Sequence, residues 1–131
     1  MNTTSYTELQ KVIKMGAIRV VVPGNFPIGC ISAYAATFAT EDPTMYDELG
    51  CLKRLNDIAK FYSDHLQQAI RELQKEHPHT VIIYGDYFHG LREVLRLAPV
   101  LGISYLSISL VKSLVWLCLE SSKLVELIYH H

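Results

Sequence analysis

The spacing of apolar and polar positions divides the chain, up to about residue 100, into predicted helices and strands. Residues 17–22 (AIRVVV) and 80–87 (TVIIYGDY) are short, mostly apolar and rich in β-branched side chains. This pattern is typical of strands covered on both faces in a parallel sheet. Between them, residues 46–76 place leucine, isoleucine or alanine mostly at intervals of three or four, which predicts one long amphipathic helix. A strand, a crossover helix and a second strand form a parallel βαβ unit.

Shorter elements flank this unit. Residues 7–15 and 91–97 have helical periodicity, and Gly16 follows the first of them as a stop signal. Residues 23–30 contain two prolines and two glycines, which predicts an irregular loop. Residues 31–45 fit either a turn or two of helix or an irregular segment.

A sheet of two parallel strands is incomplete. Parallel sheets normally contain more strands, with helices on both faces, because an outer strand leaves its backbone hydrogen-bonding groups unpaired. We therefore predict that residues 1–103 form part of an α/β domain: one parallel βαβ unit with flanking helices. The exposed strand edge favours self-association as one hypothesis.

The last part of the chain, residues 104–131, differs in character and is interpreted as a divergent apolar tail. Residues 100–119 carry a single charge, Lys112, and have the length of a membrane span. That lysine lies past the middle of the segment and several serines surround it, which weighs against a span. Three interpretations stay open: a membrane span, a buried helix or strand pair, and a segment never selected to fold.

Composition excludes some functions and limits others. Half of the residues are hydrophobic and the net charge is −1, so nucleic-acid binding is not expected. The chain begins without an apolar run after a basic start, and no signal peptide is predicted. Gly24 and Gly29 are not followed by the Gly-Lys-Ser/Thr of a phosphate loop, and we predict no cofactor.

Cysteines and histidines give no metal site. The three cysteines are Cys30, Cys51 and Cys118, and none stands in a C-x-x-C pair. Of the six histidines, two pairs stand close together, His77 with His79 and His130 with His131, and neither pair comes with carboxylate or cysteine ligands at a recognised spacing. From spacing alone, Cys30 and Cys51 are equally compatible with a disulfide and with two buried thiols.

One short motif suggests catalysis. Asp86 and His89 have the Asp-x-x-His spacing that some serine hydrolases use for their acid and base. No serine stands in a Gly-x-Ser-x-Gly turn. We therefore interpret Asp86 as the cap of a helix that begins near His89.

Three longer segments together resemble plant GDSL esterase/lipases, a branch of the SGNH hydrolases. They are GAIRVVVPGNFPIGC (16–30), YDELGCLKRLND (46–57) and LQQAIRELQKEHPHTVIIYGDYF (66–88). The resemblance spans roughly residues 5–103 and implies a three-layer α/β/α fold with a parallel sheet of about five strands. It places residues 17–22 on the fourth strand and residues 80–87 on the fifth.

The resemblance also assigns structural roles and a location. The family is secreted as a rule, which implies an extracellular protein and strengthens the case for a Cys30–Cys51 disulfide. The positions that match family motifs are interpreted as structural: Gly16, Pro23, Gly24, Asn25, Pro27, Gly29, Asp86 and Tyr87.

The family hydrolyses carboxylic esters with a serine, a histidine and an aspartate, aided by oxyanion donors. This chain has no Gly-Asp-Ser block and no C-terminal Asp-x-x-His block. The oxyanion block Gly-x-Asn-Asp is also missing, because Gly24-Asn25 runs into Phe26. Asp86–His89 matches the end of the family's fifth strand instead. We predict no catalytic or oxyanion residue and no hydrolysis by the chain alone; the alternative is a non-enzymatic interaction protein.

Overall fold

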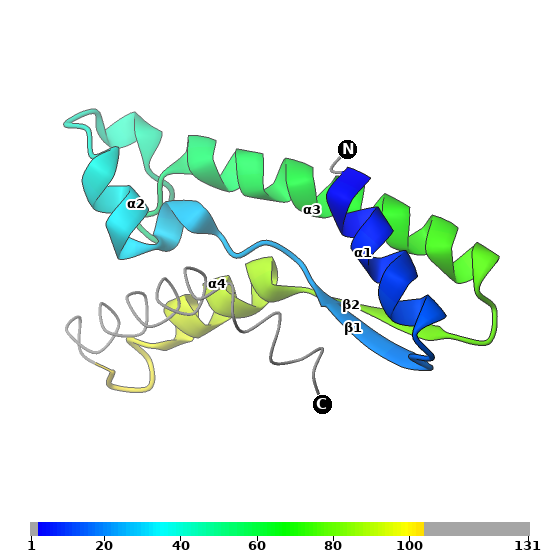
Figure 1. The fold of residues 1–131 in the computed structure, drawn as a ribbon. Helices are drawn as coiled ribbons and strands as arrows, with labels where there is room; N and C mark the ends of the chain where they lie inside the picture. Colours follow the sequence, from blue (N-terminus) through cyan, green and yellow to red (C-terminus); the bar gives the residue numbers. More distant parts are fainter. Residues whose placement is uncertain (1–2, 104–131) are drawn as a thin grey trace.

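Two short parallel strands form a sheet toward one end of the fold (Figure 1). In the computed structural model, which describes residues 3–103, strand β1 (Arg19–Pro23) pairs with β2 (Val81–Gly85) over its full length. The chain passes from one strand to the other through α3 (Lys53–Glu76). The predicted parallel βαβ unit and the mixed α/β class are confirmed.

Shorter elements surround this unit. They are α1 (Thr3–Lys14), the 3₁₀ turns η1 (Ile28–Cys30) and η2 (Pro43–Met45), α2 (Ser32–Thr37) and α4 (Tyr87–Leu97). The ambiguous segment 31–45 thus holds one short helix and one 3₁₀ turn. Gly16 follows α1 with a φ of 102°, in the region that favours glycine.

Helix α3 is shorter than the sequence predicts. Residues 46–52 were expected to be helical, but they form a turn, and α3 begins at Lys53. The Asp47 carboxylate accepts the backbone N–H groups of Leu49 and Cys51, both at 2.9 Å. A side chain that caps nearby amides in this way competes with the helix for the same donors, so the local turn replaces the first helical turns.

One face of the sheet is covered and the other is open. Successive strand side chains point to opposite faces, and α1 and α3 pack on one of them. The resulting sheet cluster consists of Leu9, Val20, Val22, Ile70, Leu73 and Ile82. On the other face, Val21, Val81 and Ile83 are 50–58% exposed. The expectation that both faces are covered is therefore wrong for the described residues, since no element among them packs on the second face.

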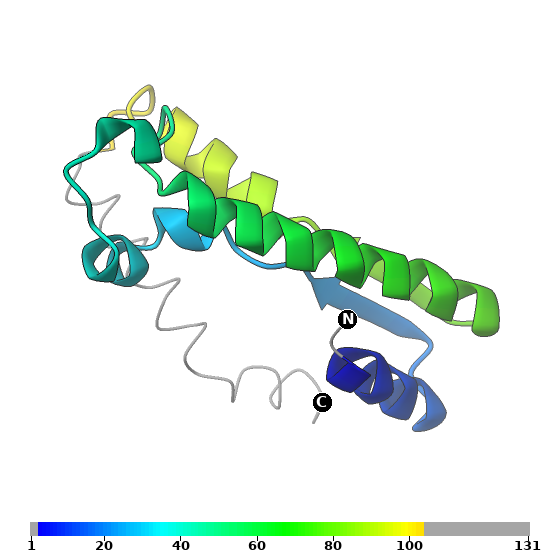
Figure 2. The same cartoon turned by 90° about the horizontal axis from the view of Figure 1, so that it is seen from above.

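A second core lies away from the strands. It contains Cys30, Cys51, Leu91 and Leu95, with Phe26 and Leu49 packed against it, and is called the disulfide cluster below. Figures 1 and 2 show α4 running beside the amino-terminal half of α3, which brings α4 to this cluster. Helix α4 begins at Tyr87, earlier than the periodicity predicts, because Asp86 caps it.

The tail predictions concern residues outside the described part of the chain. The tail 104–131, its boundary at residue 103 and most of the apolar segment 100–119 fall there. Among residues 3–103, the structure contains no helix with the length and hydropathy needed to cross a membrane.

Candidate functional site

The loop that leaves β1 begins by extending the strand pairing. The Gly24 amide donates to the Gly85 carbonyl oxygen at 2.8 Å, just past the last paired residues. A Cβ on Gly24 would collide with the Tyr84 hydroxyl. Pro23, at the end of β1, needs no amide donor there. The Pro-Gly pair therefore lets the loop cross the end of β2 at close range.

Asn25 acts in the structure through its backbone. Its amide donates to Ser63 Oγ on α3 at 3.1 Å, while its side chain is exposed and hydrogen-bonds to no other described residue. Pro27 is fully buried two residues later. The loop is thus anchored to α3 by its main chain. The Asn25 side-chain carboxamide faces solvent and contributes no hydrogen bond to another described residue.

Gly29 lies where only glycine fits. A Cβ there would collide with the Leu52 carbonyl oxygen, and the Gly29 carbonyl oxygen accepts the Leu52 amide at 3.0 Å. The Gly29 amide donates to Asn56 Oδ1 at 2.8 Å. These contacts press η1 against the start of α3.

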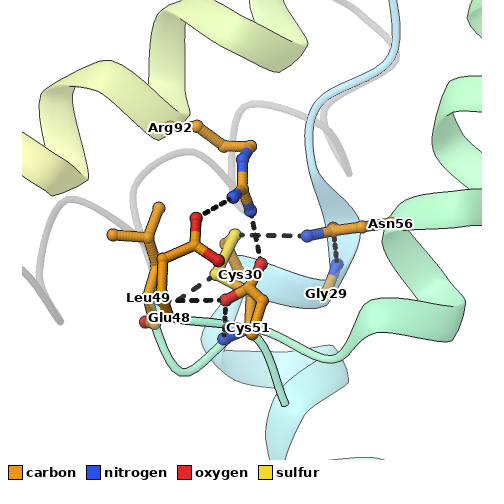
Figure 3. Close-up of a disulfide and its surroundings, with 8 residues drawn as sticks. Gly29, Cys30, Glu48, Leu49, Cys51, Asn56 and Arg92 are labelled. Carbon is orange, nitrogen blue, oxygen red and sulfur yellow. Dashed lines mark hydrogen bonds and ion pairs between the residues drawn. A yellow bond between two sulfur atoms is a disulfide. The ribbon is translucent and has the colours of Figure 1, made fainter. Parts of the chain in front are cut away.

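A disulfide joins η1 to the segment before α3 (Figure 3). Cys30 and Cys51 are 1% and 0% exposed, with their Cα atoms 4.4 Å apart. The Asn56 Nδ2 group lies 3.6 Å from Cys30 Sγ, so this buried amide contacts both the glycine and the disulfide. For a 21-residue separation, a cross-link stabilises the folded chain by about 3 kcal/mol in the chain-entropy account.

Arg92 ties α4 to the same turn. Its guanidinium group pairs with the Asp47 carboxylate and with Glu48 Oε1, the latter at 2.8 Å (Figure 3). Burial acts to raise the pKa of Asp47. The hydrogen bonds from Arg92 and from the Cys51 and Leu49 amides outweigh it and hold that pKa below its usual value.

Asp86 and His89 form a hydrogen-bonded pair at the start of α4. His89 Nδ1 lies 2.8 Å from Asp86 Oδ2, and Asp86 Oδ1 also accepts the His89 backbone N–H at 3.1 Å. The two side chains are 50% and 68% exposed, respectively. The aspartate therefore serves as an N-cap and holds the imidazole on the surface. Next to it, the Tyr87 ring packs in a tilted arrangement against the ring of Phe26 in the loop after β1, with the ring centroids 5.1 Å apart.

Ser63 is the serine that lies near this pair. It lines the same small depression of about 40 Å³ as Asp86 and His89. Its hydroxyl is buried and accepts the Asn25 amide. No hydrogen bond joins His89 to a serine among residues 3–103. Among residues 3–103, the Asp86–His89 pair therefore has no nucleophile hydrogen-bonded to it.

The described residues contain no group of three histidine, cysteine or carboxylate side chains that could hold a metal ion. His130 and His131 lie outside the described residues.

Sequence reasoning missed three polar residues that lie beside the disulfide cluster. Asn56 is 5% exposed on the buried face of α3. Its place among the apolar positions of the helical pattern could have identified it as a buried polar residue. Asp47 precedes a glycine and a cysteine, which is a turn signal hidden inside a helical pattern. Arg92 had no such signal, because its partners lie more than forty positions earlier in the chain.

Comparison with known proteins gives consistent relatives. Over 87 residues the chain is 47% identical to a GDSL esterase/lipase of Arabidopsis thaliana, covering 66% of this chain and 27% of that protein. It is 41% identical over 95 residues to acetylajmalan esterase 2 of Rauvolfia serpentina, covering 72% and 25%. Another Arabidopsis thaliana GDSL esterase/lipase is 44% identical over 82 residues, covering 62% and 21%.

The chain thus spans about a quarter of the length of the curated relatives it matches. No family model and no solved structure matches it.

Proposed function

From the premise that this chain belongs to the plant GDSL esterase/lipase family, we propose that it is a structural segment of a carboxylic ester hydrolase. It would supply two strands of the parallel sheet and their loops, without hydrolysing esters by itself. The relatives are named as esterases or lipases, which supports ester hydrolysis as the family chemistry.

The contacts of Asp86 support the proposal that the chain does not hydrolyse esters by itself. Its carboxylate caps α4 and holds His89 at the surface. Acyl transfer by a triad needs a serine within hydrogen-bond reach of the histidine. The Ser63 hydroxyl instead accepts an amide of the loop after β1. The pair therefore supports a structural role at the end of β2.

A covalent probe tests the inactivity of the chain. The full chain would be incubated with a fluorophosphonate and, separately, with p-nitrophenyl acetate, beside the variants Ser63→Ala and His89→Gln. We expect no labelled serine and equal, background ester cleavage by all three proteins. Stoichiometric labelling of one serine, with turnover lost in either variant, would overturn the proposal.

An alternative function is self-association through the sheet. Both strands have an unpaired edge among the described residues, and Val21, Val81 and Ile83 leave an apolar face beside them. Such edges pair readily with another chain. Sedimentation velocity over a hundredfold concentration range would show rising mass, reduced by Val21→Lys but not by Leu97→Lys on α4. A constant monomer mass would end this alternative.

We also propose an extracellular location for the protein. A buried disulfide persists in oxidising compartments and is rare in the cytosol. The test is alkylation of the protein isolated from plant tissue without reductant, followed by mass spectrometry. Free Cys30 and Cys51 in the native protein would contradict the proposal.

A further inference from the structure

A groove of about 460 Å³ lies between the start of α3 and the chain segment that precedes it. Its volume falls within the range of roughly 300–1,000 Å³ typical of small-molecule sites. Five of its lining side chains are apolar: Phe38, Met45, Leu52, Leu55 and Ile58. Leu52 is buried and forms part of the floor, whereas Phe38 and Ile58 are 55% and 42% exposed.

The outer wall of this groove is held in place by several polar contacts. The Tyr46 hydroxyl bonds both the amide and the carbonyl oxygen of Thr40, at 3.0 and 3.1 Å. Asp42 caps η2 by accepting the Thr44 amide at 2.9 Å. Lys53 Nζ then donates to the Thr44 carbonyl oxygen at 3.0 Å, which ties the wall to α3. The groove is therefore a built feature of the segment 38–58.

One cation at the groove has no counter-ion. Arg54 lines it and makes no ion pair or hydrogen bond with another described residue. The neighbouring Lys53 is occupied by Thr44. Asp57 lies on the next turn of α3 but is not paired with Arg54. The other polar lining residue, Thr40, has its backbone engaged by Tyr46.

We propose that this groove binds a single-chain amphiphile with an anionic head, its tail along the apolar lining and its head on Arg54. A guanidinium group binds carboxylate or sulfate oxygens through two parallel hydrogen bonds. Ile58 and Phe61, one helical turn apart and both partly exposed, extend the apolar surface beyond the groove. The site is separate from the Asp86–His89 pair and does not depend on ester hydrolysis.

Isothermal titration of the full chain with decanoate, below its micelle concentration, tests the site. We expect saturable binding at one site. Octanoate, shorter by two methylene groups, should bind about tenfold more weakly. Decanol and decyltrimethylammonium, which lack the anionic head, should bind at least tenfold more weakly than decanoate.

Variants locate the site. Arg54→Gln should weaken decanoate binding about tenfold, since a charge-assisted pair is lost. Arg71→Gln is the matched control, because Arg71 is an exposed arginine on the same helix, outside the groove, and equally unpaired. Ile58→Asn should weaken binding by a similar factor through the apolar lining. Both changed side chains are at the surface, and circular dichroism would verify that each variant keeps its fold.

Several outcomes would overturn the proposal. Absence of saturable decanoate binding would do so, as would equal affinity for decanol. Equal losses in Arg54→Gln and Arg71→Gln would reveal unspecific charge attraction. Unchanged binding by Ile58→Asn would place the ligand elsewhere.

Discussion

The two cores of this chain are stabilised in different ways. The sheet cluster consists only of aliphatic side chains from α1, β1, α3 and β2, and its elements have regular helix and strand hydrogen bonds, apart from the two open strand edges. The disulfide cluster lies where η1 and the 46–52 turn meet α4, and there the backbone is irregular. Buried amides in such a region need side-chain partners. Asn56 and Asp47 accept such amides, Arg92 pairs with the Asp47 carboxylate, and the disulfide joins the segments covalently. In this chain the regular elements enclose an apolar core, whereas the irregular segments pack with the help of polar side chains and a cross-link.

The largest expected effect is on the sheet cluster. Leu73 is fully buried, so Leu73→Ala removes apolar contacts and leaves a cavity. We expect a loss of about 4 kcal/mol in the free energy of unfolding, measured by urea titration followed by circular dichroism. Leu97→Ala, at an exposed position of α4, is the control and should change little. A loss in Leu73→Ala as small as that in Leu97→Ala would mean that α3 is not packed on the sheet.

The next largest effect concerns the disulfide cluster, whose stability depends on redox conditions, unlike that of the sheet cluster. Replacing Cys30 and Cys51 together with alanine should lower the free energy of unfolding by about 3 kcal/mol. A reducing agent should destabilise the wild type and leave the double variant unchanged. An unaltered urea midpoint for the reduced wild type would contradict a stabilising role of the disulfide.

Asn56→Ala should leave the Gly29 amide buried without an acceptor. We expect a loss of about 2 kcal/mol in the free energy of unfolding. Asn25→Ala removes an amide of the same kind from an exposed position, so it should be neutral. If both variants are neutral, water or another group replaces the Asn56 contact.

The smallest effect concerns charge and pH. Arg92→Met removes the partner of Asp47 and should cost about 1 kcal/mol at neutral pH. Arg96→Met on the same helix removes an arginine whose partner Glu93 is exposed and should have no measurable effect.

The pH dependence has a defined sign. Because the pKa of Asp47 is lower in the folded chain, its contribution is present above its ordinary pKa of about 4. It is lost as pH falls through the depressed folded pKa. The stability difference between wild type and Asp47→Asn should therefore shrink on acidification from pH 6 to pH 2. If the stability difference between the two proteins stayed constant with pH, the titration of Asp47 would not be its cause.

The strands were predictable and the start of α3 was not, for physical reasons. Runs of β-branched residues at 17–22 and 80–87 identify strands by local preference alone. Burial of the second sheet face depends on partners distant in sequence, and the described residues provide none. The helical period of residues 46–52 was overridden by Asp47, whose carboxylate takes two local amides.

The candidate site shows the same division. Asp86 as a cap follows from its position between a strand and a helix, and the structure confirms it. The ion pair of Arg92 and the groove beside Arg54 depend on how the segment 38–52 folds back. No periodic pattern in the sequence specifies that path.

The disulfide also bears on the order of folding. Arg19 pairs with Val81, so β1 must wait for the whole intervening chain before it meets β2. Contacts of such high sequence separation slow folding, because loop closure precedes the gain from pairing. A bond between Cys30 and Cys51 bypasses 21 positions of that path. In the oxidised chain the loop between the two strands is effectively shorter than in the reduced chain. Closing it costs less entropy, by a few tenths of a kcal/mol.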